Sequence, residues 1–349
     1  MAKKLKNKVV NKVGAEEVDA LTIEKLRGWA RVKAFLLSKK TRRFLWGIIR
    51  TVLLAGLCFL ILYPLIIQLS TSLKSEEDLY DKTVIFIPRA ANLNNYTIMW
   101  NYVKFPELFA NSVLYSLLLS VLQMASCTLV AYGLARFKFK GNGIVFGLII
   151  FTLVVPVQLI TEAMKQRYMA FNPLTMFSMD GSVFSRDAAG INLTGGWAIL
   201  FLMSATAVMF KNGLYIFLLR QYFRNQPKEL EDAAYIDGAS TFRTFWQIML
   251  PSALPLMVTV FLFSFVWQYN DTWYLKALYP TAPVLSVSIG DAAQRYVFSL
   301  QQGGGQTNNP LISIYNAAVM IMHIIPLIVL YVFCQRFFVQ SIERSGMVG

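Results

Sequence analysis

Residues 227–251, PKELEDAAYIDGASTFRTFWQIMLP, form a charged and aromatic stretch between two long hydrophobic segments. Pro227 suits the first position of a helix, where its missing N–H costs nothing, and three acidic residues follow where the helix dipole favours negative charge. Gly238 suits the left-handed position that ends a helix, and Ser240 suits the cap of another one. The stretch therefore predicts two short helices joined by a turn at Gly238.

The two predicted helices differ in character. The first carries a leucine, two small alanines and an acid at helical spacing, which is a surface that another protein can approach closely. These residues are Leu230, Ala233, Ala234 and Asp237. The second carries an apolar stripe suited to lipid headgroups or to neighbouring helix ends, with polar residues opposite. The apolar stripe consists of Phe242, Phe245, Trp246 and Met249. The polar side consists of Arg243 and Gln247.

The composition is that of a membrane protein. The 349 residues are 56% hydrophobic and only 15% charged, with a mean hydropathy of +0.49. A soluble protein would carry more charge. The three cysteines, Cys58, Cys127 and Cys334, fall inside hydrophobic stretches without CxxC spacing, so they predict packing residues and no disulfide framework or zinc site.

The net charge of +14 is concentrated near the N-terminus, where residues 1–48 hold 13 Lys and Arg against four acids. This position favours membrane orientation and contact with lipids over nucleic-acid binding. The segment has no short apolar core or small-residue cleavage site before Lys39, so we do not expect a signal peptide. Residues 21–35 fit either an interfacial helix or a solvated basic tail.

Six hydrophobic segments have about the 20 residues that a helix needs to cross a bilayer. The chain is therefore predicted to be an all-α integral membrane protein, with kinks at Pro156, Pro255 and Pro326. The predicted spans are residues 45–69, 112–135, 143–163, 196–222, 252–272 and 312–335.

The charges of the connecting segments predict the orientation. The link at 136–142 carries Arg136, Lys138 and Lys140 without an acid, which places it in the cytoplasm by the positive-inside rule. Both termini then lie on the same, cytoplasmic side. The predicted organisation is a basic N-terminal extension, a six-helix domain with a cytoplasmic loop, and a cytoplasmic tail. Their bounds are 1–44, 45–335 with the loop at 223–251, and 336–349.

The loop resembles the EAA motif of membrane subunits of binding-protein-dependent ABC importers, which reads Glu-Ala-Ala, three residues, Gly, nine residues, Ile, one residue, Leu-Pro. Every spacing is kept, and the departure is Asp232 in place of the usual Glu. The shorter side chain weakens the expectation of an ion pair there, which Glu231 is placed to make instead. The matching residues are Asp232, Ala233, Ala234, Gly238, Ile248, Leu250 and Pro251.

The resemblance implies the type I ABC importer permease fold, with a coupling helix that sits in a groove of a cytoplasmic ATPase. It extends over roughly residues 45–349 and is most similar to the smaller six-span subunit of maltose-type carbohydrate importers, including the segments at 86–100 and 131–141. The residues to which it assigns ATPase coupling are Glu231, Asp232, Ala233, Ala234, Asp237, Gly238, Ala239 and Arg243.

The resemblance also implies partners in a bacterial cell membrane. These are a second, homologous permease chain, two ABC ATPase subunits and an extracellular solute-binding protein that delivers a carbohydrate. The chain lacks GxxxxGK[ST], so we expect it to be no enzyme and to hold no cofactor or metal, with ATP and Mg bound by the ATPases. The external loop at 273–311 is expected to reach into the binding protein or to be a mobile surface loop. The external loop at 164–195 is expected to pack on the binding protein or on the pore mouth.

Candidate residues for the substrate path lie in the fourth and fifth predicted spans. Lys211 falls near the middle of the fourth, where a charge is costly unless it faces protein or water. It suits an anionic sugar, a pore acid, or an interruption of the helix near Asn212. The outer end of the fifth carries aromatic and polar side chains that suit a sugar, although an interfacial aromatic belt explains them as well. These are Trp267, Asn270, Asp271 and Trp273.

An ion-coupled secondary transporter is the alternative class. Lys211, Asp271 and His323 in the last span would then carry charge. His323 is also explained by hydrogen bonds between helices, which are the commoner use of such a residue. Dependence of uptake on ATP or on an ion gradient separates the two classes.

Overall fold

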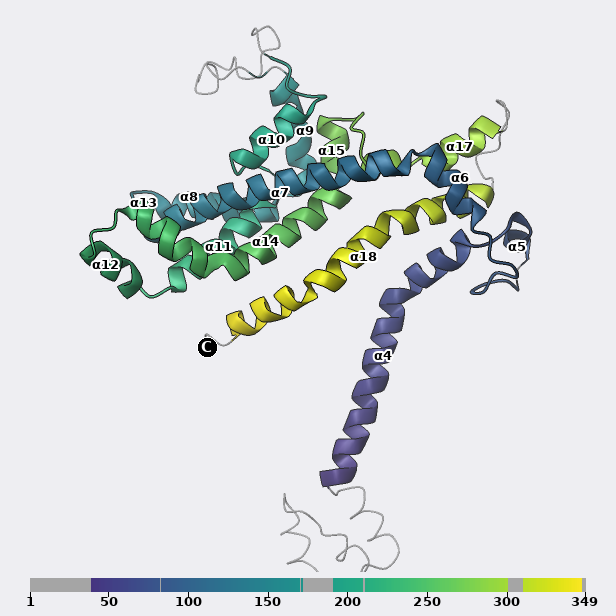
Figure 1. Cartoon of the computed structure of the whole chain (residues 1–349), viewed down its shortest axis with the longest axis horizontal. Coiled ribbons are helices and arrows are strands. Elements are labelled where there is room, and N and C mark those ends of the chain that lie inside the picture. Colours follow the sequence, from purple (N-terminus) through teal and green to yellow (C-terminus); the bar gives the residue numbers. More distant parts are fainter. Residues whose placement is uncertain are drawn as a thin grey trace, which may run out of the picture. The chain divides into compact units, whose positions relative to one another are not determined.

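The computed structural model describes residues 39–81, 83–169, 171, 191–209, 211–300 and 310–346 (Figure 1). The secondary structure of this part of the chain is helical, apart from one isolated bridge between Phe171 and Ile191. The chain divides into two units, residues 1–67 and 68–349, which are described separately. The predicted N-terminal interfacial helix and most of the predicted external loop at 164–195 lie outside the described residues.

The first unit contains most of helix α4, Lys39–Ser72. Apolar side chains cover this helix on all sides, and those described between residues 43 and 65 are largely exposed, among them Phe44, Trp46, Leu60 and Ile61. A helix that is hydrophobic all round requires an apolar environment. The predicted first span, 45–69, is therefore a continuous helix that extends beyond the prediction at both ends.

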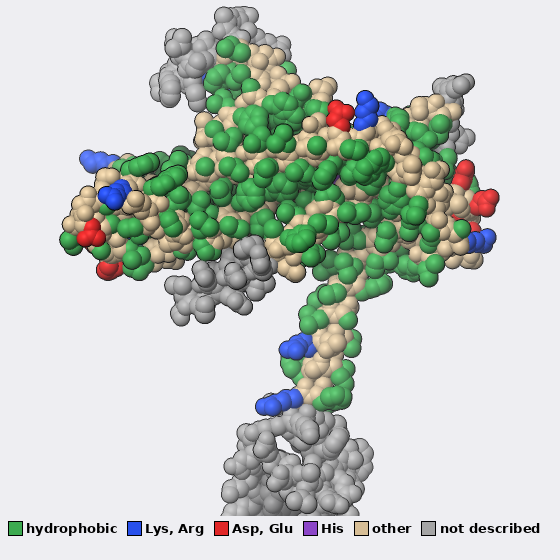
Figure 2. All heavy atoms as spheres, in the orientation of Figure 1, with side chains coloured by type: hydrophobic (Ala, Val, Ile, Leu, Met, Phe, Trp, Pro, Cys, Tyr) green, Lys and Arg blue, Asp and Glu red, His purple; other side chains and the backbone are tan. Residues whose placement is uncertain are grey.

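The second unit is built around α7, Phe105–Arg136, which packs along α11, Asn212–Asn225, and α14, Leu250–Asn270 (Figure 1). Helix α18, Pro310–Gly346, packs against α14 and α6, Asn94–Tyr102. Figure 2 shows hydrophobic side chains over the middle of the visible face, with charged ones at its edges. Such a surface fits a bilayer.

Shorter helices complete this unit. Their bounds are α5, Glu76–Tyr80; α8, Asn142–Val154; α9, Val157–Met169; α10, Trp197–Ala205; α12, Glu229–Ile236; α13, Thr241–Thr244; α15, Trp273–Leu278; α16, Leu285–Ser288; and α17, Ala292–Leu300. A π-helix, Phe245–Met249, joins α13 to α14.

Four helices in the described residues are long and apolar enough to cross a membrane, or five if α8 and α9 form one span. They are α4, α7, α18 and the continuous helix Thr241–Asn270, and they coincide with the first, second, sixth and fifth predicted spans. The fifth span thus begins inside the predicted loop, at Thr241, and α18 runs past the predicted end of the sixth span at residue 335.

The third and fourth predicted spans are broken helices. Helices α8 and α9 meet at an angle of 109° on either side of Pro156, which is a break where the sequence predicted a kink. The fourth span is interrupted between α10 and α11, where Ala207 and Lys211 have φ angles of 56° and 67°. Left-handed non-glycine residues cannot continue a right-handed helix, so the interruption predicted near Asn212 is present.

Candidate coupling helix and polar centre of the bundle

Helix α12 begins at Glu229, with Lys228 before it, so Pro227 lies outside the helix and the prediction was wrong by two residues. The backbone carbonyl of Lys228 accepts from the N–H groups of Glu231 and Asp232 at 2.9 and 3.0 Å. As predicted, the first turn contains the three acidic residues, where their negative charge interacts favourably with the positive end of the helix dipole.

The turn that ends α12 has the predicted geometry. Gly238 has a φ of 77°, and its N–H donates to the carbonyl of Tyr235 at 3.1 Å, while that of Ala239 donates to Ala234 at 2.9 Å. These two bonds make a Schellman motif. The Ser240 hydroxyl then accepts from the Arg243 N–H at 3.3 Å and caps α13. Two short hydrogen-bonding motifs therefore fix the direction in which α12 leaves the bundle.

One side of α12 is anchored to α7. Glu231 is buried, and its Oε1 accepts from the Tyr132 hydroxyl at 3.0 Å and pairs with Arg136 Nε at 3.3 Å. The Arg136 guanidinium also donates to the carbonyl of Gln226 at 2.9 Å, just before the helix. Ala234, one turn after Glu231, is buried as well. A single carboxylate thus connects α12 to the end of α7, the helix around which this unit is built.

The other side of α12 is exposed. Ile236 is 86% exposed, and Asp232, Ala233 and Asp237 are also on the surface. No part of the chain that the structure describes covers these side chains. The predicted coupling residues therefore divide into an inner pair, Glu231 and Ala234, and an outer group that includes Asp232, Ala233, Asp237, Gly238 and Arg243.

The predicted apolar stripe after Ser240 does not remain on one face. Phe245 and Met249 are buried in the core with Tyr132, whereas Phe242 and Trp246 are exposed and stack at a centroid distance of 6.2 Å. The reason is the π-helix, whose wider turn rotates these residues relative to an α-helix. Pro251, which lacks an N–H, was the signal in the sequence for this local change.

A polar cluster in the middle of the bundle was not predicted. Gln123 of α7 accepts through Oε1 from the Ser264 hydroxyl and from Gln268 Nε2, the latter at 3.2 Å, and donates through Nε2 to Asn212. Gln268 in turn accepts from Tyr115 at 3.3 Å. Because buried polar groups are costly when unpaired, these bonds hold α7, α11 and α14 in one register.

Two of the predicted path residues meet next to this cluster. Lys211, the residue before α11, places its Nζ 4.4 Å from the centroid of the Trp267 ring of α14, which is a cation–π contact. A cavity of about 630 Å³ lies beside Lys211, between the α8–α9 break and the α10–α11 break. The interruption between α10 and α11 therefore brings a cation and an aromatic face together beside an open space.

The other predicted path residues lie around a cavity of about 320 Å³ that Trp267, Asn270, Asp271 and Trp273 help to line. Asn270 Oδ1 is 3.2 Å from His323 Nε2. Trp273 is exposed, as an interfacial aromatic residue would be. The structure thus gathers the aromatic and amide groups of the prediction around one space.

Asp271 also has a structural role at this position, just after the end of α14. Its two carboxylate oxygens accept from the N–H groups of Tyr274 and Leu275, each at 3.1 Å, and so cap α15. Capping alone is enough to explain this carboxylate.

Comparison with known proteins adds relatives over most of the chain. The chain is 25% identical over 289 residues to the probable ABC transporter permease protein YurM of Bacillus subtilis, and the match covers 83% of this chain and 84% of that one. It is 24% identical over 302 residues to the arabinooligosaccharides transport system permease protein AraQ of Halalkalibacterium halodurans, with 86% and 95% covered. The sn-glycerol-3-phosphate transport system permease protein UgpE of Yersinia pestis is 25% identical over 292 residues, with 82% and 92% covered.

A solved structure shares the fold. It is the crystal structure of a bacterial ABC transporter involved in the import of the acidic polysaccharide alginate, with a TM-score of 0.65, 21% identity, and coverage of 86% of this chain and 98% of that one. Residues 124–344, more than half of the chain, match the model of the binding-protein-dependent transport system inner membrane component family. The matched range includes α12 and three residues of the polar cluster, Asn212, Ser264 and Gln268. The chain therefore belongs to this family of membrane components of binding-protein-dependent transport systems.

Proposed function

We propose that the chain is a permease subunit of an ATP-binding-cassette importer that moves a carbohydrate delivered by an extracellular solute-binding protein. The observation that carries the proposal is α12, a short helix anchored through Glu231 on one side and exposed through Ile236 on the other. Such a helix can pass a push or pull from a partner to α7. The relatives named for arabinooligosaccharides and for alginate support a carbohydrate as the solute.

The partners follow from this assignment. An ATPase subunit binds the exposed side of α12 and supplies ATP hydrolysis with its own Mg, while a second permease chain completes the path. A complete importer would contain two ATPase subunits and one binding protein. The basic residues at 1–48 and 136–142 support a position in a bacterial cell membrane with both termini and α12 in the cytoplasm.

For the substrate path we propose the region from Lys211 to Trp273. The Trp267 ring is suited to the C–H face of a sugar, and its contact with Lys211 places a positive charge beside it. An anionic sugar derivative would gain most from this pair, since it can contact the ring and the ammonium together. The polar cluster around Gln123 then serves to hold the helices that carry these two side chains.

The test is to purify the chain with its associated subunits, reconstitute the complex in vesicles, and screen neutral and anionic glycans with the binding protein. We expect one group of glycans to stimulate ATP hydrolysis, and only when the binding protein is present. Uptake that continues without ATP and stops when the ion gradient is removed would contradict the proposal and favour an ion-coupled transporter.

A further inference from the structure

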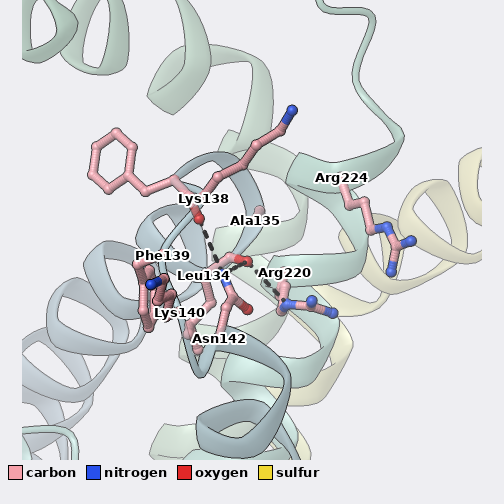
Figure 3. Close-up of a pocket in the computed structure, with 9 residues that line it drawn as sticks. Leu134, Ala135, Lys138, Phe139, Lys140, Asn142, Arg220 and Arg224 are labelled. Atoms are coloured by element: carbon pink, nitrogen blue, oxygen red, sulfur yellow. Dashed lines mark hydrogen bonds between the residues drawn. The ribbon is translucent and has the colours of Figure 1, made fainter.

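A basic cavity lies apart from the proposed substrate path, where the end of α7, the link at 137–141, the start of α8 and the end of α11 meet (Figure 3). Its volume is about 570 Å³. Among the described residues that line it, four are cationic and none is acidic. The cations are Lys138, Lys140, Arg220 and Arg224.

These cations lack a carboxylate partner within the part of the chain that the structure describes. Arg220 donates through Nε to the carbonyl of Leu134 at 3.3 Å and lies over the Phe146 ring at 3.8 Å, and neither contact neutralises it. Arg136, just before the link, differs because Glu231 neutralises it. Figure 3 shows these side chains pointing in different directions around the cavity, so they give this end of the bundle a broad positive potential, which favours an anionic surface.

The backbone beneath the cavity is held in place. Asn142 Nδ2 donates to the carbonyls of Leu134 and Phe137 at 3.1 and 3.0 Å (Figure 3). Gly141 turns the chain with a φ of 93°. Arg220 reaches the same Leu134 carbonyl from α11. The link that carries the two lysines is therefore fixed to both neighbouring helices, and a bound anion would not have to order it.

An apolar surface begins next to the cavity. None of the side chains of α8 is buried, and Ile144, Leu148 and Phe151 follow one another along it as exposed residues. Phe137 and Phe139 of the link are about half exposed. Because α8 lies in the third predicted span, its apolar side chains face acyl chains. A phosphate at the cations that carries its own acyl chains would contact both surfaces, whereas free phosphate or an acidic peptide would contact only the cations.

We propose that this cavity binds the headgroup of an anionic phospholipid of the inner leaflet, with its acyl chains along α8. The proposal rests on the membrane orientation given under the proposed function. No residue of α12 is among the described residues that line the cavity, so the lipid site and the ATPase-binding face are separate surfaces of the same end of the bundle. A lipid here would stabilise the junction of α7, α8 and α11.

The test uses the double variant Lys138→Gln/Arg224→Gln in the complex with its associated subunits. Each basic residue near a membrane contributes about 1 kcal/mol to anionic-lipid binding, so we expect phosphatidylglycerol to bind about 30-fold more weakly. Bound lipid is counted by native mass spectrometry after exchange into mixtures of phosphatidylglycerol and phosphatidylcholine. Lys104→Gln, an exposed cation at the other end of α7, is the matched control and should retain the lipid.

Lys138→Arg/Arg224→Lys keeps both charges and should also retain the lipid, which separates loss of charge from misfolding. Equal phosphatidylglycerol retention by the Gln variant and the wild type would overturn the proposal. So would displacement of the lipid by millimolar inorganic phosphate, which would indicate a free-anion site, or loss of the ATPase subunit with lipid retained, which would indicate a protein contact. Lipid counting needs neither ATP nor solute, so its failure is distinguishable from failure of the transport assignment.

Discussion

At the scale of single residues, adjacent acids in α12 have opposite environments. Glu231 is buried between Tyr132 and Arg136, while Asp232 faces outward. The family motif places its acid at position 232, where this chain has the shorter Asp in place of Glu. Side-chain length alone therefore suggested that Glu231 takes over the role of the motif acid. The structure gives Glu231 an internal partner, whereas Asp232, the acid at the motif position, lies on the exposed side of α12.

We expect Glu231→Ala to destabilise the chain by roughly 3–5 kcal/mol, because it leaves the buried Arg136 charge unpaired. The measurement is thermal unfolding in detergent. Asp232→Ala is the matched control and should unfold like the wild type, although it lowers solute-stimulated ATP hydrolysis in the complex. Equal unfolding temperatures for the two variants would contradict the anchoring role of Glu231.

Lys211→Met removes the cation from the Trp267 ring while preserving much of the side-chain length. We expect uptake of an anionic solute to fall by roughly 30-fold, since a desolvated cation–π contact is worth on the order of 2 kcal/mol. The affinity of the free binding protein for the solute should not change. Unchanged uptake in the reconstituted complex would assign Lys211 a structural role.

At the scale of elements, the α8–α11 contact depends on a glycine at the start of α11. A Cβ at Gly213 would lie 2.7 Å from Thr152 Oγ1 and 2.8 Å from the Ile149 carbonyl, so the two helices can approach only because this side chain is absent. Close approach at small residues is a common way for helices to associate in membranes. The broken fourth span is held to the rest of the bundle partly at this point.

Gly213→Ala should therefore lower stability by about 1–3 kcal/mol, the usual effect of overpacking. Gly147→Ala, in α8 itself, is the control because a Cβ there has no atom within 4 Å. Thermal unfolding of the two purified variants compares them directly. A Gly213→Ala protein as stable as the Gly147→Ala protein would show that the helices separate easily at this contact.

The sequence predicted elements well where the signal is local or uniformly apolar. The turn at Gly238 and the cap at Ser240 depend on the nearest few residues, and α4, α7, α14 and α18 on long apolar runs. The breaks in the third and fourth spans were harder to predict. Hydropathy depends on residue type alone, so it does not reveal positive φ angles such as those at Ala207 and Lys211. It also does not distinguish a kink at Pro156 from a bend of 109°.

The contacts of the candidate site were predictable in part. Lys211 and Trp267 were each candidates from residue type and depth, but their contact depends on the broken helix that places Lys211 toward α14. Gln123 and Arg136 were missed as members of a site because their partners are far away in the sequence, at Ser264, Gln268 and Glu231. Such contacts arise only from the packing of α7 on its neighbours.

At the scale of the whole molecule, the second unit combines an apolar surface, an enclosed polar cluster and a short helix exposed at one end. This combination suits a subunit that lies in a membrane, provides part of a path, and receives force from outside the bilayer. We propose that the force enters through the exposed side of α12 and reaches α7 through Glu231.

The most direct test of this claim is the amount of ATPase subunit that co-purifies with Ile236→Glu. Ile236 is 86% exposed in α12, so a charge there should leave folding intact and disrupt an apolar contact with the ATPase. Ile87→Glu, at an isoleucine that is 82% exposed outside the coupling site, is the control. We predict that Ile236→Glu loses the ATPase while Ile87→Glu retains it; full retention of the ATPase by Ile236→Glu would contradict the account.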